Sequence, residues 1–123
     1  MTRIYLVKNF GRWADSESLT DELLKDTVAE MDEGLIDANL GGSIFKKRIG
    51  INGQGKSSSL RTIVGFKSGD RAFFVYGFPK NQRDNIGTKE KAAFKEMAKE
   101  LFALTDEQLD LAIQGKALRQ LSD

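Results

Sequence analysis

Apolar residues recur along this chain with the period of a strand in some segments and of a helix in others. The run Ile4–Val7 has strand character, whereas Phe10–Ala14 is too short to assign. A helix is predicted next, beginning near Ser18 and Asp21 and ending at Gly34. Its apolar residues have the spacing of one helix face: Leu24, Val28, Met31 and Leu35. Its many acidic residues are interpreted as the solvated face of the same helix.

The middle of the chain has the pattern of antiparallel strands. Strands are predicted over residues 44–51, 60–67 and 71–78, with a Gly/Ser-rich loop over 52–59 and a tight hairpin turn at 68–70. The last of these strands contains the sequence AFFVYGF, which is apolar at successive positions. It should therefore be covered on both faces and lie inside the sheet.

Helical periodicity returns after Thr88. The first C-terminal helix should run to about Leu104, and Thr105 with Gln108 forms a capping box that begins a second helix, which Gly115 ends. A short polar tail is expected after it. The apolar positions expected to face the core are Ala93, Met97, Ala98, Leu101 and Phe102 in the first helix, and Leu109, Ala112 and Ile113 in the second.

Together these elements predict an α+β fold. It is a small, mostly antiparallel sheet of about four strands, with N-terminal helices packed on one face and two C-terminal helices. With 123 residues and no repeat or interdomain linker, the chain is predicted to be a single domain spanning residues 1–123. No apolar run approaches the roughly 18 residues of a membrane span, and the N-terminus lacks the pattern of a signal peptide. A soluble, cytoplasmic protein is therefore expected.

The composition excludes several kinds of site. The chain contains no cysteine and no histidine. This removes disulfides, thiolate metal sites, Cys nucleophiles, His-ligated zinc and the Ser-His-Asp arrangement. It also removes the usual general base near neutral pH. No metal site and no cofactor are expected.

Charge is unevenly distributed, although the formal net charge is only +1. Residues 1–42 carry a net charge of −5, residues 43–91 carry +8, and residues 92–123 carry −2. A basic region is the electrostatic footprint of a nucleic-acid binder, so the strand-rich middle is the candidate for contact with phosphates. A simpler interpretation is that the helices are acidic on their solvated faces and the strands are not.

Residues 50–57, GINGQGKS, satisfy the phosphate-loop pattern G-x-x-x-x-G-K-[ST]. In a nucleotide-binding site a helix follows that loop, because the helix N-terminus supplies part of the anion site. Here the β-branched strand sequence LRTIV (60–64) follows, and no later apolar strand ends in an Asp that would hold the metal. The match is interpreted as a hairpin loop carrying one basic side chain, Lys56, and no nucleotide cofactor is predicted.

Strand alternation decides which basic residues act together. Lys46 and Arg48 should point to one face of their strand, whereas Lys47 should share the other face with Phe45 and Ile49, near a sheet edge. The other predicted members of a basic surface open or follow the neighbouring strands or lie in the loop: Arg61, Lys80, Arg83 and Lys56. Such a surface neutralises phosphates without sequence preference. Three aromatic residues nearby either stack on bases or belong to the core: Phe45, Tyr76 and Phe78.

A cluster of lysine and arginine permits cleavage of RNA without a metal. The 2′-OH of RNA can attack the adjacent phosphate, given a base, an acid for the leaving 5′-oxygen and cations on the crowded phosphate. Neighbouring cations lower the pKa of a lysine, which suits lysine as the base, and arginine stays charged and binds phosphate through two hydrogen bonds. The residues alone therefore indicate a basic-faced α+β domain that binds RNA or DNA.

Three segments carry a family resemblance: LGGSIFKKRI (40–49), GQGKSSSLRTIV (53–64) and GDRAFFVYGFPKNQRDNI (69–86). They resemble the RelE/HigB-like toxins of bacterial type II toxin–antitoxin modules. The resemblance implies a twisted antiparallel sheet with two helices on one side. It also implies an endoribonuclease that cuts mRNA on the ribosome, arrests translation and is held inactive by a cognate antitoxin, expected to be a helix-turn-helix protein.

The same resemblance assigns the candidate residues. Lys46 and Arg48 take the place of the family's basic strand pair, and Arg61 takes that of a phosphate-stabilising arginine. Lys80 falls where many relatives carry an arginine that acts as an acid or stabilises charge. These four are the catalytic candidates. The candidates for RNA binding are Lys47, Lys56 and Arg83.

Three positions depart from the family pattern. Ile86 stands where relatives carry a tyrosine that positions the RNA, Ser58-Ser59 replaces Gly-Gly, and Lys80 replaces arginine. Reduced or altered activity is an alternative that these departures leave open. Two further alternatives remain: a non-catalytic gyrase inhibitor, as among ParE-like relatives on the same scaffold, and a degenerate homologue that retains antitoxin binding and operator repression.

Overall fold

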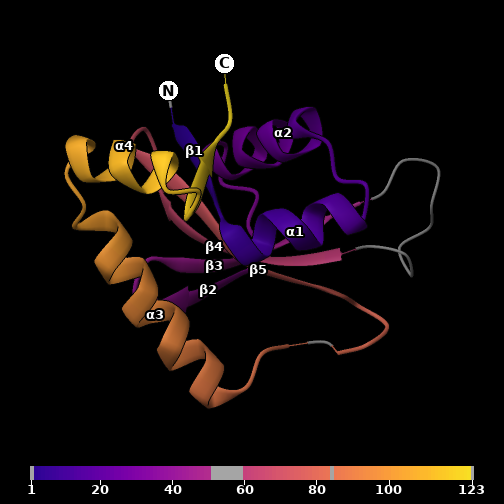
Figure 1. Ribbon diagram of the computed structural model, residues 1–123. Helices are drawn as coiled ribbons and strands as arrows, with labels where there is room; N and C mark the ends of the chain where they lie inside the picture. Colours follow the sequence, from indigo (N-terminus) through magenta and orange to yellow (C-terminus); the bar gives the residue numbers. More distant parts are fainter. Residues whose placement is uncertain (1, 51–59, 84, 123) are drawn as a thin grey trace.

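The computed structural model describes residues 2–50, 60–83 and 85–122 (Figure 1). None of the helices in these ranges has the length and apolar character needed to cross a membrane. The elements in chain order are β1 (Arg3–Val7), α1 (Lys8–Ser16), α2 (Asp21–Asp32), β2 (Ala38–Gly41), β3 (Ile44–Ile49), β4 (Leu60–Lys67), β5 (Arg71–Pro79), α3 (Thr88–Phe102), α4 (Asp106–Gln114) and β6 (Leu118–Gln120).

The strands form one sheet in the order β2-β3-β4-β5-β1-β6. Strand β1 runs parallel to β5, and the other neighbouring pairs are antiparallel. The β4–β5 hairpin turns at residues 68–70, where Gly69 has a φ of +76° and the Asp70 N–H donates to the Lys67 carbonyl over 3.0 Å. The α+β fold with a mostly antiparallel sheet is confirmed, and β5 lies inside the sheet as predicted.

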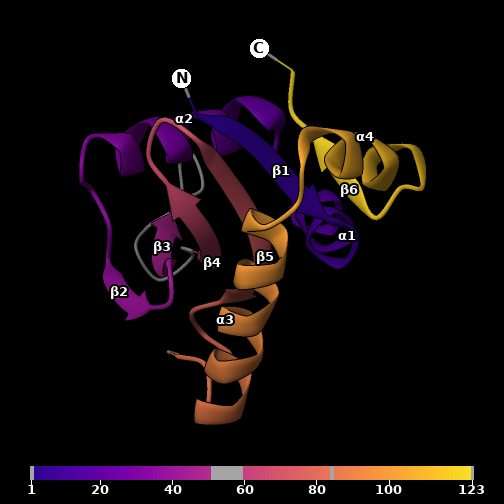
Figure 2. The ribbon, with the colours of Figure 1, turned by 90° about the vertical axis from the view of Figure 1, so that its left-hand side faces the viewer.

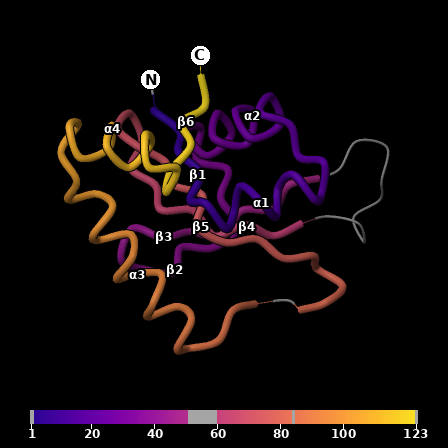
Figure 3. The backbone as a smooth tube through the Cα atoms, in the orientation of Figure 1, coloured from indigo at the N-terminus to yellow at the C-terminus, as the bar shows by residue number. Residues whose placement is uncertain are grey.

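Helices cover both faces of the sheet, as Figures 1 and 2 show. Helices α1 and α2 pack on one face, while α3 packs on the other and α4 lies beside β6. The core under α1 and α2 includes Leu6, Phe10, Leu24, Val28, Met31, Val64 and Phe74. The core under α3 and α4 includes Tyr5, Ile44, Ile63, Phe73, Val75, Ala98 and Leu109. The two chain ends lie at the same end of the molecule (Figure 3).

The sheet has six strands in the described residues, rather than the four predicted. The two strands that the sequence pattern does not indicate, β2 and β6, are four and three residues long and form the two edges. Strands this short show no alternation that distinguishes them from loops. The prediction of a polar tail after Gly115 is wrong. This segment forms β6, which pairs with β1, and its Leu118 and Leu121 are buried.

Helix α1 contains the segment Phe10–Ala14 that the pattern could not assign. Phe10 and Ala14 are its buried residues, four positions apart. Between them, Trp13 packs against Gly77 of β5, where an added Cβ would lie 2.1 Å from Cζ3 of the indole. The close contact of α1 with the sheet therefore requires a residue without a side chain at position 77.

The predicted inner faces of the longer helices are confirmed in part. In α2 the confirmed residues are Leu24, Val28 and Met31. The prediction for Leu35 is wrong, because α2 ends at Asp32 and Gly34, with a φ of +92°, turns the chain away, so that Leu35 is 55% exposed. In α3, Ala93 and Met97 are exposed, and Phe94 faces the sheet instead. The confirmed members of that face are Ala98, Leu101 and Phe102.

Candidate nucleic-acid interface

Strands β3 and β4 place three of the predicted basic residues on one face of the sheet. Arg48 lies directly opposite Arg61, and Lys46 lies opposite Ile63. Ile63 belongs to the core under α3, so the register places Lys46, Arg48 and Arg61 on the α3 side of the sheet. Arg48 is exposed, while Lys46 and Arg61 are half-buried. We call these three residues the basic face.

The Arg48–Arg61 pair concentrates positive charge. Side chains directly opposite each other in antiparallel strands have Cβ atoms about 4.5–5.5 Å apart, and like charges at such positions destabilise a sheet. Guanidinium groups at such positions can donate charge-assisted hydrogen bonds to the same anion. The arrangement is therefore suited to a phosphodiester.

Strand β5 extends this face with aromatic residues. Phe78 lies opposite Arg61 but is only 1% exposed, so it belongs to the core. Tyr76 is half-buried and stacks on Phe94 of α3, with ring centroids 5.3 Å apart. Phe45 packs on the opposite face of the sheet. Of the three aromatic residues named from the sequence, only Tyr76 therefore combines position on this side with partial exposure.

Arg83 is fixed beside the basic face by several contacts. Its guanidinium carbon lies 5.5 Å from the centroid of the Phe78 ring, and Nε donates to the carbonyl of Asn85 over 2.9 Å. Both terminal nitrogens donate to the two carboxylate oxygens of Glu90. Glu90 also accepts the N–H of Gly87 over 2.9 Å, at the start of α3. Arg83 therefore ties the segment after β5 to the first turn of α3.

Glu90 is a residue of this region that the sequence reasoning missed. A signal for it exists, because Glu90 occupies the third position of α3, where a carboxylate binds free N–H groups at a helix start. Its hydrogen bond with Arg83 lowers the pKa of the Glu90 carboxyl and raises the pKa of the Arg83 guanidinium. The pair thus holds both groups in their charged forms.

We expect the substitution Glu90→Gln to lower the free energy of unfolding at pH 7. The pKa of Glu90 lies below its ordinary value of 4.5 in the folded chain, so its contribution is complete above pH 4.5 and is lost as the pH falls through the lowered pKa. The deficit of the variant should therefore shrink between pH 5 and pH 2.5, measured by urea unfolding. Glu100→Gln, at an exposed position of the same helix, is the control. A deficit of equal size at both pH values would contradict this role of the ion pair.

Lys80 lies just beyond the end of β5, exposed in the turn that follows Pro79. Pro79 pairs with Leu60, and Leu60 also pairs with Ile49. The end of β3, the start of β4 and the end of β5 thus meet at one end of the sheet, which Figure 3 shows in the backbone trace. The Arg48–Arg61 pair lies near this end of the sheet, so Lys80 lies at the end of the sheet next to the basic face.

Lys56 and residues 51–57 of the phosphate-loop match lie outside the described residues. The element that follows the match is strand β4, which begins at Leu60. A nucleotide-binding phosphate loop would lead into a helix, so the prediction of a strand at this place is confirmed. Within the described ranges, acidic side chains form no group of three or more that could hold a metal ion.

Lys47 lies on the opposite face of the sheet from the basic face. The residue is 7% exposed, and its Nζ lies 2.7 Å from Oε1 of Glu30 in α2. Its carbonyl accepts the hydroxyl of Thr62 over 2.8 Å. The expectation that its ammonium reaches water near an edge is wrong, because α2 covers it and Glu30 pairs with it. These contacts favour a structural role over RNA binding.

We expect Lys47→Ala to lower the free energy of unfolding by about 1–3 kcal/mol, because it removes a buried aliphatic stem and one partner of an ion pair. Lys47→Met keeps most of that stem and should recover most of the stability. Urea unfolding measures both, and fluorescence anisotropy with a short RNA should show affinity unchanged in Lys47→Met. A stable Lys47→Met variant with weakened RNA binding would support the RNA-binding prediction instead.

Almost the whole chain matches one known protein family. Residues 2–121 match the family described as the RelE toxin of the RelE/RelB toxin–antitoxin system. No curated protein matches the chain. The matched range contains all the described helices and strands, and with them the basic face and the Arg83–Glu90 pair.

Proposed function

Because this chain belongs to the RelE toxin family of toxin–antitoxin systems, we propose that it acts by cutting mRNA on the ribosome. Membership of the family implies an antitoxin as its partner, for which we propose a helix-turn-helix protein. Ribosome-bound mRNA is found in the cytoplasm, which we propose as the site of action. The observation that carries the proposed activity is the basic face, with Arg48 and Arg61 opposite each other and Lys46 beside them.

The proposed reaction is a transesterification within the RNA strand. The 2′-oxygen attacks the adjacent phosphorus, the bond from phosphorus to the 5′-oxygen breaks, and the products carry a 2′,3′-cyclic phosphate and a 5′-hydroxyl. Lys46 is the proposed base that takes the 2′-OH proton. Arg48 and Arg61 hold the non-bridging oxygens, on which negative charge grows in the transition state. Lys80 protonates the 5′-oxygen or stabilises its charge.

The surroundings of these residues support this assignment. Lys46 and Arg61 are half-buried, which limits solvent screening of their charge, while Arg48 is open to a large ligand. The bonds of Arg83 with Glu90 and its contact with Phe78 fix the border of the face. Ile86, which replaces the tyrosine of relatives, is half-buried against the core under α3. Its side chain therefore packs against the core, and we assign the chemistry to the cations.

A translation reaction with purified components tests the proposed function. Addition of the purified chain should stop protein synthesis and shorten the mRNA, and addition of its antitoxin should restore synthesis. DNA supercoiling by gyrase, assayed in parallel, should be unaffected. Inhibited supercoiling with intact mRNA would overturn the proposal in favour of a gyrase inhibitor. An effect on neither process, with an intact antitoxin complex, would overturn it in favour of a homologue that has lost the activity.

A further inference from the structure

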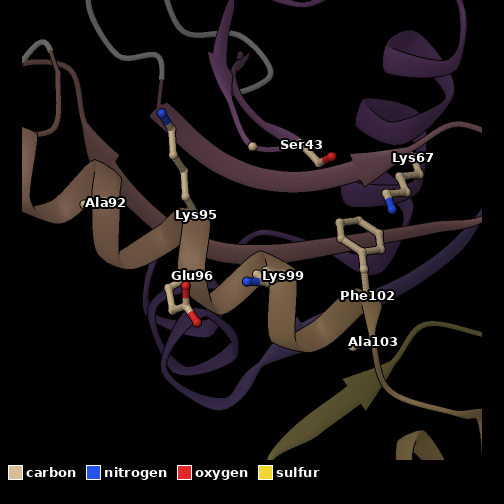
Figure 4. A pocket seen from close by; sticks show the side chains of 9 residues that line it. Ser43, Lys67, Ala92, Lys95, Glu96, Lys99, Phe102 and Ala103 are labelled. Atoms are coloured by element: carbon tan, nitrogen blue, oxygen red, sulfur yellow. The ribbon is translucent and has the colours of Figure 1, made fainter.

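A second group of basic residues lines a cleft over the C-terminal half of α3. The cleft has a volume of about 660 Å³ and lies between α3, the β2–β3 turn and the end of β4 (Figure 4). This size falls in the range of about 300–1,000 Å³ typical of ligand pockets. Three lysines and one carboxylate supply the charged side chains of its lining: Lys67, Lys95, Lys99 and Glu96. We call it the lysine cleft.

The backbone around the lysine cleft leaves room for Lys95. An added Cβ on Gly42 would lie 2.9 Å from Cγ of Lys95, and one on Gly41 would lie 3.1 Å from its Nζ. Both glycines have positive φ, +86° for Gly41 and +57° for Gly42. The β2–β3 turn is thus a tight glycine turn over which the Lys95 side chain lies, and its ammonium is held at the wall of the cleft.

Lys67 is placed by an aromatic contact. It is the last residue of β4, and its Nζ lies 4.6 Å from the ring centroid of Phe102. The Phe102 ring fits against Gly65, where an added Cβ would lie 3.4 Å from Cε2. Lys99 follows Lys95 by one helical turn on the same face of α3. Side chains from α3 and β4 thus line the cleft, with Lys67 and Phe102 at one end and Lys95 toward the other, as Figure 4 shows.

Within the described part of the chain, the three lysines of the lysine cleft form no ion pair. The ion pairs found there involve other cations: Arg3, Lys25, Lys47, Arg71, Arg83 and Arg119. Glu96 offsets one of the three positive charges that line the cleft. Ammonium groups that line one cleft without an ion pair attract anions, and a phosphate group has the acceptor oxygens to bind them.

The lysine cleft also lies on the same side of the sheet as the basic face. Lys91, Lys95 and Lys99 are spaced four residues apart, so they form a stripe about 12 Å long on one face of α3. The stripe begins next to Glu90, the partner of Arg83. Figure 2 shows α3 running along the side of the sheet that carries the basic face. A chain of regularly spaced phosphates can follow such a line of cations.

We propose that the lysine cleft binds the phosphate backbone of the RNA strand that is cut, at nucleotides flanking the scissile phosphate. The proposal rests on the proposed function, since it adds a second contact to the same substrate. The cations of the cleft set how tightly and in which position the strand is held. The basic face performs the chemistry.

Binding of single-stranded RNA tests the proposal directly. The probe is a fluorescent 12-nucleotide RNA with 2′-O-methyl groups, which cannot be cut because the nucleophile is blocked. The variant Lys95→Gln/Lys99→Gln should bind about 25-fold more weakly at about 0.1 M salt, and its slope of log K against log salt should be smaller by about 1.4. The control Lys8→Gln/Lys116→Gln removes the same charge at exposed positions outside the cleft and should lose at most about threefold.

Other outcomes overturn the proposal. An equal loss of affinity in the control would mean that RNA binding follows net charge alone. A calorimetric titration in which inorganic phosphate binds the wild type and not the variant, with RNA affinity unchanged, would make the cleft a small-anion site. Weakened antitoxin binding with unchanged RNA affinity would make it a protein interface. Thermal unfolding of all variants confirms that each is folded.

Kinetics on ribosome-bound mRNA separate this proposal from the proposed function. The cleft variant should raise the protein concentration needed for half-maximal cleavage while leaving the maximal rate within about twofold, because it loses binding and no reacting group. A cleft variant with a reduced maximal rate and normal half-saturation would overturn the proposal. If the wild type binds RNA through the cleft but cuts no mRNA, only the proposed function fails.

Discussion

Replacing Lys46 with alanine should lower the rate of mRNA cleavage by about 10²–10⁴-fold, the range that a general base contributes. Lys46 shares the basic face with Arg48 and Arg61, so it is the lysine placed beside the two groups proposed to bind the phosphate. The free energy of unfolding should change by about 1 kcal/mol or less, because Lys46 is only half-buried. Single-turnover cleavage on programmed ribosomes and urea unfolding measure the two quantities.

The variant Lys46→Arg distinguishes a base from a positive charge. Arginine keeps the charge and stays protonated, so it cannot accept the 2′-OH proton. We expect Lys46→Arg to be as slow as Lys46→Ala while retaining more of the RNA affinity. A Lys46→Arg variant that cuts at close to the wild-type rate would contradict the assignment of Lys46 as the base and leave it a charge-stabilising role.

Gly77→Ala should lower the free energy of unfolding by about 3 kcal/mol, the upper part of the usual range for overpacking a core. A Cβ at this position would lie 2.1 Å from Cζ3 of Trp13, so the indole has to move. Trp13 also contacts Phe10, with ring centroids 5.6 Å apart, which restricts that movement. Because Gly77 lies between Tyr76 and Phe78, the displacement should also disturb the border of the basic face. Thermal and urea unfolding provide the measurement.

Two further variants isolate the cause of this effect. Trp13→Leu in the Gly77→Ala background should restore part of the lost stability, which gives a favourable coupling energy in the double-mutant cycle. Gly11→Ala, on helix α1 where an added Cβ meets no atom within 4 Å, should instead stabilise the chain slightly. If Gly77→Ala unfolds at the wild-type urea concentration, the tight packing of Trp13 against β5 is contradicted.

The elements with a local signal are those that the sequence predicts well. Strand β5 has a long apolar run, and α4 begins at a capping box in which the Thr105 hydroxyl accepts the N–H of Gln108 over 3.1 Å. The edge strands β2 and β6 have no such signal, because they are only four and three residues long, and β6 also forms by pairing with the distant β1. The same holds for the parallel pairing of β1 with β5, which joins residues about 70 positions apart.

In the candidate site too, some positions are predicted by the sequence and others depend on the three-dimensional fold. Alternation along β3 places Lys46 and Arg48 on one face, and this is evident from the sequence. The position of Arg61 opposite Arg48 depends on the register of the hairpin, and the burial of Lys47 depends on where α2 lies. The lysine cleft joins the β2–β3 turn, the end of β4 and α3, so only the three-dimensional arrangement reveals it.

The chemistry of the newly formed RNA ends decides whether the basic face cuts by the proposed route. Purified protein and ribosomes programmed with a defined mRNA should yield fragments with a 2′,3′-cyclic phosphate and a 5′-hydroxyl. An mRNA with a single 2′-deoxynucleotide at the cleaved position should resist cleavage there, because the attacking oxygen is missing. Cleavage of that deoxy-substituted mRNA at the normal rate, or fragments that end in a 3′-hydroxyl and a 5′-phosphate, would contradict cleavage by lysine and arginine through the 2′-OH.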